Sequence, residues 1–221
     1  MTDSSVASLP YPPLDRFTRL TQKQVEDRLQ HVKSSINATD EVWIFAYGSL
    51  MWNPAFEPVE QCLVNAPGFV RRYCFWTISS RGCQQTPGLG LGIEAGVAGC
   101  IGMAQRMSPA HLEEQLAQLW EREMGTGVYQ ATWIPLFTPT GRRIRGLGFV
   151  ADPNNNLYVK DLDPDCMARV MSRAQGVYGK CRDYLALLVE QLKAMGVRET
   201  ELEQLLVQVD RVGHSGLELN Q

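Results

Sequence analysis

Short runs of β-branched and aromatic residues fill the middle of the chain and are the feature that most limits its fold. The first run, Glu41 to Tyr47 (EVWIFAY), is too short for a helix and stops at Gly48-Ser49, so we predict a buried strand that ends in a tight turn. Gly and Pro separate the further strands, which we predict over residues 68–79, 97–107, 129–137 and 144–151. Several strands with few helices between them predict a small curved or barrel-like mixed β-sheet.

Apolar residues at helical spacing mark the segments around these strands. One packing helix is expected from the cap Thr21 to Asn37, and a second after Ser108-Pro109. Three more helices are expected near the C-terminus, beginning at Asp163-Pro164, spanning the stripe from Tyr184 to Leu192, and beginning at a capping box of Thr200 and Glu203. Strands followed by helices are typical of an α+β protein.

The length of 221 residues fits one large domain or two small ones, and a single domain is the simpler prediction. We divide the chain into an N-terminal arm and helix (1–40), one domain (41–212) and a C-terminal tail (213–221).

Charge and cysteine usage exclude several classes of function. The 21 Lys and Arg residues against 24 Asp and Glu give a net charge of −3, so we expect no nucleic acid partner. No apolar stretch reaches the roughly eighteen residues of a membrane span, and no apolar signal core lies near the start. The 6 cysteines form neither a C-x-x-C pair nor a cluster with histidine, so we expect free thiols and no metal. Together these features predict a soluble, cytoplasmic protein that does not bind membranes.

Glu123 is the most informative charged residue. The apolar stripe that precedes it consists of Leu112, Leu116, Leu119 and Trp120. Continuing this stripe by one turn reaches Glu123, whose carboxylate then projects from the apolar face. Burial raises a carboxyl pKa and suits it to proton transfer near neutral pH. Alternatively, Glu123 turns into solvent or pairs with Arg122 or Arg72, and spacing alone leaves both interpretations open.

The turn within residues 44–52 (IFAYGSLMW) is the second candidate site. A glycine after a buried strand allows a positive φ, so that successive N–H groups converge on an anion such as a carboxylate. A plain strand-to-loop turn is the alternative. Ser49 lacks the G-x-S-x-G context of a nucleophile.

Two other patterns are less specific. The glycines of residues 88–92 (GLGLG) do not open a helix, so we expect a mobile loop or a tight strand entry rather than a dinucleotide site. Arg71, Arg72 and Arg81 lie near aromatic residues and either bind an anionic ligand or are solvated.

Two segments together resemble one protein family. They are Trp43 to Pro54 (WIFAYGSLMWNP) and Trp120 to Met124 (WEREM), with Tyr129 following. Both are similar to segments of the ChaC-type γ-glutamylcyclotransferases, which act on glutathione, and the resemblance runs from about Val42 to Val209.

The resemblance implies a fold, a reaction and a site. The fold is a single α+β domain, with helices flanking the small sheet, over residues 41–212. The reaction releases 5-oxoproline and Cys-Gly from the small-molecule substrate glutathione, without cofactor or metal. The residue that corresponds to the family's general base is Glu123. The residues that correspond to the family's substrate-binding turn are Ile44, Phe45, Ala46, Tyr47, Gly48 and Ser49.

One position departs from the family pattern. Cys181 stands where the family usually has asparagine, so activity or specificity could differ in this chain. The alternatives are therefore a cyclotransferase for other γ-glutamyl amino acids or amines, and a catalytically silent protein that binds a small metabolite.

Overall fold

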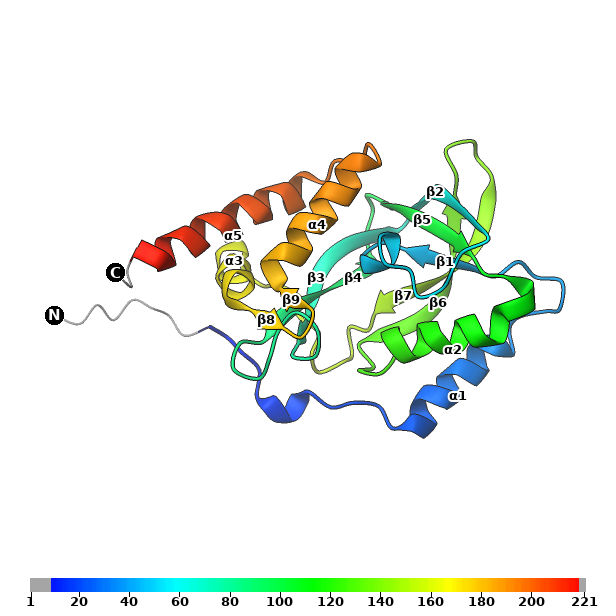
Figure 1. Cartoon of the computed structure of the whole chain (residues 1–221), viewed down its shortest axis with the longest axis horizontal. Coiled ribbons are helices and arrows are strands. Elements are labelled where there is room, and N and C mark those ends of the chain that lie inside the picture. Colours follow the sequence, from blue (N-terminus) through cyan, green and yellow to red (C-terminus); the bar gives the residue numbers. More distant parts are fainter. Residues whose placement is uncertain (1–8, 219–221) are drawn as a thin grey trace. The chain divides into compact units, whose positions relative to one another are not determined.

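The computed structural model describes residues 9–218 and is shown in Figure 1. The chain divides into two compact units. The barrel unit comprises residues 18–75 and 91–158, and the helical unit comprises the described parts of 1–17, 76–90 and 159–221.

A closed ring of strands forms the centre of the barrel unit. In ring order, its strands are β1 (Trp43–Ala46), β5 (Cys100–Arg106), β2 (Glu60–Ala66), β6 (Tyr129–Phe137) and β7 (Arg143–Ala151). Neighbouring strands are antiparallel, except that β7 pairs in parallel with β1 and so closes the ring. The predicted barrel-like mixed sheet is confirmed.

Two further strands extend this sheet beyond β7. Strand β4 (Gly88–Ala95) pairs in parallel with β7 through Ile93 and Val150, and β3 (Phe69–Thr77) follows β4 in the sheet. Residues 88–92 therefore form a strand entry, one of the two outcomes expected for the glycine-rich segment. The sequence interpretation missed β2 (EQCLVNA), which is mostly half-exposed and contains a single β-branched residue.

Burial explains why the ring strands form where they do. All four residues of β1 are buried, as the apolar run predicts. Strands β6 and β7 pair over their full length, from Tyr129 opposite Ala151 to Phe137 opposite Arg143. The short connection between them contains Gly141, whose φ of 85° is the left-handed conformation that such hairpin loops need.

Helix α1 (Gln22–Lys33) begins at the predicted cap. Thr21 and Gln24 form a reciprocal capping box. The helix ends before Asn37, because the hydroxyls of Ser34 and Ser35 donate to the carbonyls of His31 and Val32 and the chain turns there.

Helix α2 (Leu112–Glu123) lies beside α1 in the barrel unit (Figure 1). Its predicted start at Ser108-Pro109 is wrong, because Pro109–His111 forms a short 3₁₀ turn and the Ser108 side chain makes no capping bond.

Apolar side chains of α1, α2 and the strands β1 and β7 share one core. The indole N–H of Trp120 donates to the carbonyl of Val25 at 3.2 Å, so α1 is bonded to α2 as well as packed on it. The buried members of this core are Val32, Val42, Ile44, Ala46, Leu50, Phe56, Met107, Leu116, Leu119, Trp120, Met124, Leu147 and Phe149.

Three longer helices make up most of the helical unit: α3 (Pro164–Arg173), α4 (Cys181–Ala194) and α5 (Thr200–Glu218). They pack on one another, and the smaller elements of this unit are η1 (Leu14–Arg16), β8 (Gln175–Gly176) and β9 (Gly179–Lys180). As predicted, the Asp163 side chain caps α3 by accepting from the N–H of Cys166.

The start and end of α5 differ from the prediction. Thr200 is already the first helical residue, and the Glu203 carboxylate pairs with Arg198 and Lys193 instead of closing a capping box. Residues 213–218 of the predicted tail continue α5, while residues 219–221 and the start of the arm, 1–8, lie outside the described residues.

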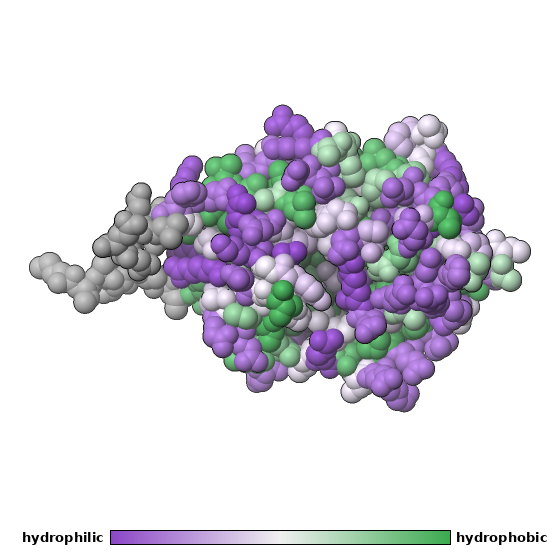
Figure 2. All heavy atoms as spheres, in the orientation of Figure 1, coloured by the Kyte–Doolittle hydropathy of each residue, from purple (hydrophilic) through white to green (hydrophobic). Residues whose placement is uncertain are grey.

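The face of the molecule seen in Figure 2 is predominantly hydrophilic. Figure 2 shows hydrophobic side chains on the visible face in small separate groups, which is ordinary for a globular surface. Within residues 9–218, no helix combines the length and the apolar composition that crossing a bilayer requires.

Candidate active site

Glu123 ends helix α2, at the position to which the apolar stripe points. Leu116, Leu119 and Trp120 are almost wholly buried beneath it. The Glu123 side chain itself is only 16% exposed. The prediction of a carboxylate on the apolar face is therefore confirmed by its burial.

The alternative of pairing with Arg122 also holds. The Nε atom of Arg122 lies 3.1 Å from Oε1 of Glu123. Arg72, the other partner considered, pairs instead with Glu94 at 2.8 Å. Glu123 is thus a buried carboxylate with one cation beside it.

Burial and this cation act on Glu123 in opposite directions. Loss of water raises the pKa of the Glu123 carboxyl above its ordinary value, and the Arg122 charge partly offsets that rise. A carboxylate with a raised pKa is a stronger base than one on the surface, which suits it to exchanging protons with an amine.

The turn after β1 forms a compact 3₁₀ structure, η2 (Ser49–Met51). The Met51 N–H donates to the carbonyl of Gly48 at 2.9 Å, and the Asn53 N–H donates to that of Ser49 at 2.8 Å. The expected positive φ at Gly48 is wrong: its φ is −135°, so the turn is made by the hydrogen bonds of η2 rather than by a left-handed residue.

Side chains from other strands fix this turn in place. The buried Arg71 guanidinium on β3 donates to the carbonyl of Tyr47 at 2.6 Å and to that of Ile101 at 2.6 Å. The Gln105 amide on β5 donates to the carbonyl of Leu50 at 2.9 Å. The Tyr47 hydroxyl donates to the carbonyl of Phe149 at 2.5 Å. The turn is therefore held in one geometry before any ligand arrives.

Arg122 connects the turn to the carboxylate. Its Nη2 atom donates to the Ser49 hydroxyl at 2.9 Å, and its Nη1 atom donates to the carbonyl of Asn53 at 2.6 Å. The structure thus brings Ser49 and Glu123, predicted from segments more than seventy residues apart, into one constellation.

The other predicted residues of the turn lie deeper. Ile44, Phe45 and Ala46 are fully buried in β1 and pair with Gln105, Ala104 and Met103 of β5. Tyr47 is 7% exposed and faces the core. Gly48 and Ser49 are the members of the predicted set that reach the turn itself.

The sequence interpretation missed Arg71 and Gln105 as anchors of the turn. It treated Arg71 as solvated or ligand-binding, whereas Arg71 is buried on the face of β3 that it shares with Tyr73 and Phe75. Because side chains alternate between the two faces of a strand, the apolar residues Tyr73 and Phe75 could have indicated that Arg71 is buried.

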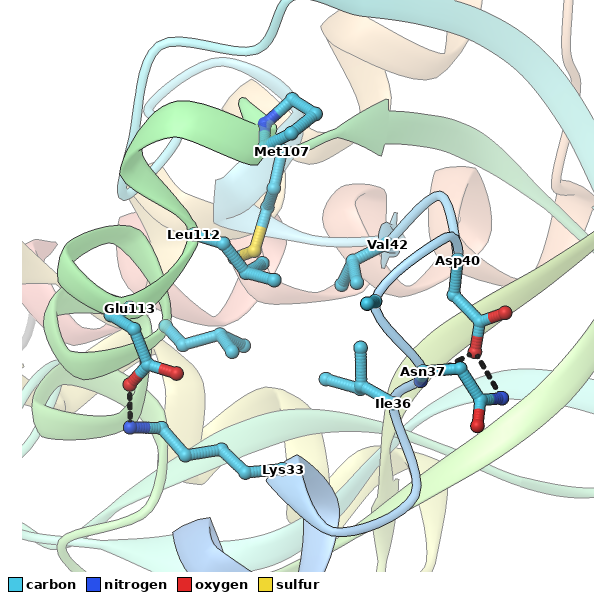
Figure 3. Close-up of a pocket in the computed structure, with 11 residues that line it drawn as sticks. Lys33, Ile36, Asn37, Asp40, Val42, Met107, Leu112 and Glu113 are labelled. Atoms are coloured by element: carbon cyan, nitrogen blue, oxygen red, sulfur yellow. Dashed lines mark hydrogen bonds and ion pairs between the residues drawn. The ribbon is translucent and has the colours of Figure 1, made fainter.

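A separate cavity of about 220 Å³ lies at the opposite end of α2 (Figure 3). Its walls are mostly apolar, with the Lys33–Glu113 ion pair on one side and Asn37 bonded to Asp40 on the other. Leu112 on its wall is eleven residues before Glu123, which corresponds to about 16 Å along a helix. This cavity is not part of the candidate site.

All six cysteines are free thiols, as predicted. Cys181 is fully buried at the start of α4 in the helical unit, where its thiol lies 3.5 Å from the carbonyl oxygen of Leu89. Burial raises the pKa of Cys181 to about 11 and that of Cys74 to about 12. A hydrogen bond with the Thr86 hydroxyl instead lowers the pKa of Cys83.

These differences predict the order of alkylation. Because the thiolate is the reactive form, iodoacetamide at pH 8 should modify Cys83 before Cys74 and Cys181 in the native protein. Peptide mapping by mass spectrometry after brief labelling measures this order. Substituting serine for Cys83 should remove the fast phase, and a first label on Cys181 would contradict the prediction.

The fold has solved counterparts. It matches a crystal structure of a yeast γ-glutamyl cyclotransferase specific to glutathione with a TM-score of 0.73 at 19% identity, covering 80% of this chain and 99% of that one. At this identity the likeness defines the fold class only: the ring of strands and its flanking helices are those of a γ-glutamylcyclotransferase-like protein.

The sequence comparisons identify the family. Residues 42–212 match the family of ChaC-like proteins, and the chain belongs to this family. It is 37% identical over 171 residues to the glutathione-specific γ-glutamylcyclotransferase of Escherichia coli strain K12, covering 77% of this chain and 74% of that protein. It is also 28% identical over 176 residues to the human glutathione-specific γ-glutamylcyclotransferase 1, covering 78% of each chain.

Proposed function

We propose that the protein is a glutathione-specific γ-glutamylcyclotransferase, which converts the γ-glutamyl group of glutathione to 5-oxoproline and releases Cys-Gly. The observation that carries the proposal is the buried Glu123 carboxylate, tied through Arg122 to the turn at Ser49. The names of the relatives from E. coli and human support glutathione as the substrate.

The reaction needs no nucleophile from the protein. The α-amine of a γ-glutamyl amide can attack its own γ-carbonyl and close a five-membered ring. Holding the chain in that folded shape is worth on the order of 7–11 kcal/mol in well-oriented intramolecular reactions. What remains for the protein is to bind the folded chain and to move protons.

Glu123 supplies the proton transfers in this proposal. The α-amine has a pKa near 8 and is mostly ammonium at neutral pH, so a base must take a proton before the amine can attack. As the new C–N bond forms and the amide C–N bond breaks, the ring nitrogen gives up protons and the departing Cys-Gly nitrogen gains them. One carboxylate that accepts and then returns each proton balances the reaction.

The turn supplies the binding surface. We propose that the backbone N–H groups of Gly48 and Ser49 face the γ-glutamyl end of the substrate and stabilise the oxyanion that develops on the γ-carbonyl. Ile44, Phe45 and Ala46 contribute to this binding surface by forming the buried strand that leads into the turn. The anchors on Tyr47 and Leu50 keep these amides in position.

A comparison of substrates tests this function. Purified protein is given glutathione or γ-glutamyl-alanine, and 5-oxoproline is quantified over time. We expect faster turnover of glutathione. Faster turnover of γ-glutamyl-alanine would assign the same ring closure to a different substrate, and glutathione binding without 5-oxoproline would indicate a silent binding protein.

A further inference from the structure

Arg122 uses all three nitrogen atoms of its side chain at the junction between α2 and the turn. Nε pairs with Glu123, Nη2 donates to the hydroxyl of Ser49, and Nη1 donates to the carbonyl of Asn53. The guanidinium therefore contacts the end of the helix, the first residue of η2 and Asn53, which lies two residues after η2. Its side chain is 28% exposed, so water screens these contacts only in part.

The contacts on the turn reinforce one another. Ser49 receives the Nη2 bond on its hydroxyl, while its carbonyl accepts from the N–H groups of Trp52 and Asn53 at 3.2 and 2.8 Å. Asn53 in turn offers its own carbonyl to Nη1. Arg122 thus binds the turn across its length, and the turn cannot shift relative to Glu123 without breaking at least one of these bonds.

The ion pair also orients the carboxylate. Nε lies 3.1 Å from Oε1, so the guanidinium holds that oxygen of the Glu123 carboxylate in a fixed direction. A planar guanidinium can hold such a geometry through several directed bonds, whereas the ammonium of lysine is a point charge on a flexible chain.

We propose that Arg122 is a positioning residue that fixes the Glu123 carboxylate relative to the turn at Gly48 and Ser49. The inference rests on the proposed function, in which Glu123 exchanges protons with a substrate bound at that turn. Arg122 acts through Glu123 and Ser49 and makes no contact with the reacting atoms in this scheme. A misplacement of about 1 Å in such a constellation can cost roughly 10²-fold in rate.

Two substitutions separate the charge of Arg122 from its geometry. R122M removes both the charge and the geometry. R122K keeps the charge but loses the simultaneous contacts with Glu123, Ser49 and Asn53. Arg142 provides the matched control, because it is a half-exposed arginine of the barrel unit that pairs with Glu41 and Glu60. R142M and R142K should stay within about twofold of the parent in kcat and KM, since exposed ion pairs contribute little.

The pH profile of 5-oxoproline release from glutathione gives the decisive readout. R122M should lower kcat by about 10²-fold with a smaller change in KM. Without the cation the ionised form of Glu123 is less favoured, so the acid limb of kcat/KM should move to higher pH. R122K should keep the acid limb close to that of the parent while kcat stays well below it. A folded R122M with parental kcat and an unmoved acid limb would overturn the inference.

Hydrogen exchange separates this inference from the proposed function. In R122M the amides of Trp52 and Asn53 should exchange faster than in the parent, with exchange in β6 and β7 unchanged. If the parent released no 5-oxoproline from any γ-glutamyl compound, the proposed function would fail. In that case the exchange data alone would test the positioning role: exchange at Trp52 and Asn53 that is the same in R122M as in the parent would overturn it. Should R122M not fold, the same two measurements on R122K decide: parental kcat and parental exchange would exclude the role.

Discussion

Glutamine in place of Glu123 is expected to abolish 5-oxoproline release from glutathione while leaving the fold intact. The amide keeps the size of the side chain but cannot accept a proton from the substrate ammonium. Loss of a general acid–base group typically lowers the rate by about 10²–10⁴-fold, and here one group serves both proton transfers. Steady-state assays, together with binding of glutathione measured by calorimetry, separate the loss of chemistry from a loss of binding.

The same substitution should raise stability at neutral pH. Because burial raises the folded-state pKa of Glu123, this group favours folding at low pH, and that contribution is lost as the pH rises through the raised pKa. The glutamine variant does not titrate, so its advantage over the parent should be absent in acid and should grow toward neutral pH. Thermal unfolding at several pH values measures the difference.

Glu121 offers the matched control, because it lies on the same helix and is exposed. Glu121→Gln should leave turnover within about twofold of the parent, since exposed substitutions rarely have large effects. If E123Q kept activity within about tenfold of the parent, Glu123 would not be the group that moves the protons.

Methionine in place of Arg71 is expected to give the largest loss of stability among single substitutions near the turn. It would leave the buried carbonyls of Tyr47 and Ile101 without the donors they now have. An unsatisfied buried acceptor costs about 1–3 kcal/mol, so the two together predict a loss of about 2–6 kcal/mol. For a chain of this length that corresponds to a fall in Tm of roughly 4–24 °C.

Arg72 is the control for this prediction. It is the next residue on β3, points the other way and pairs with Glu94 at a partly exposed position. R72M should lower stability by less than about 1 kcal/mol. Denaturant unfolding of both variants measures the contrast, and kcat/KM should fall in R71M because the released turn no longer holds its amides in place. Equal stability of R71M and R72M would show that the Arg71 contacts are not what fixes the turn.

Local patterns predicted the elements that depend on local signals. Two strands were expected at residues 129–137 and 144–151 and a helix cap at Thr21, and β6, β7 and the start of α1 agree closely with these expectations. Strand β2 had no such signal, because its burial comes from pairing with β5 and β6 rather than from its own composition. The start of α2 was placed too early because Pro109 begins a 3₁₀ turn, a structure that is frequent at the N-termini of α-helices.

The spacing of apolar residues alone identified Glu123 as a candidate but could not decide whether its carboxylate is buried or paired with an arginine. In the structure it is both buried and paired with Arg122. The resemblance to a family, not the periodicity, linked Glu123 to the turn. The contacts that create the site join residues far apart in sequence: Arg71 is 24 residues from Tyr47, Gln105 is 55 from Leu50, and Arg122 is 73 from Ser49. Such pairs follow from how strands β3 and β5 and helix α2 are placed around the turn, which no single stretch of sequence encodes.

Helix α1 precedes residues 42–212, the part of the chain shared with the family. Its Val32 nevertheless lies in the same core as Leu116, and its Val25 carbonyl accepts the indole proton of Trp120, one turn before the acid. A fragment trimmed to the shared region would expose that flank of the acid-bearing helix to water. We therefore expect a truncated form of this protein to need α1, and so to begin before residue 22 rather than at residue 42.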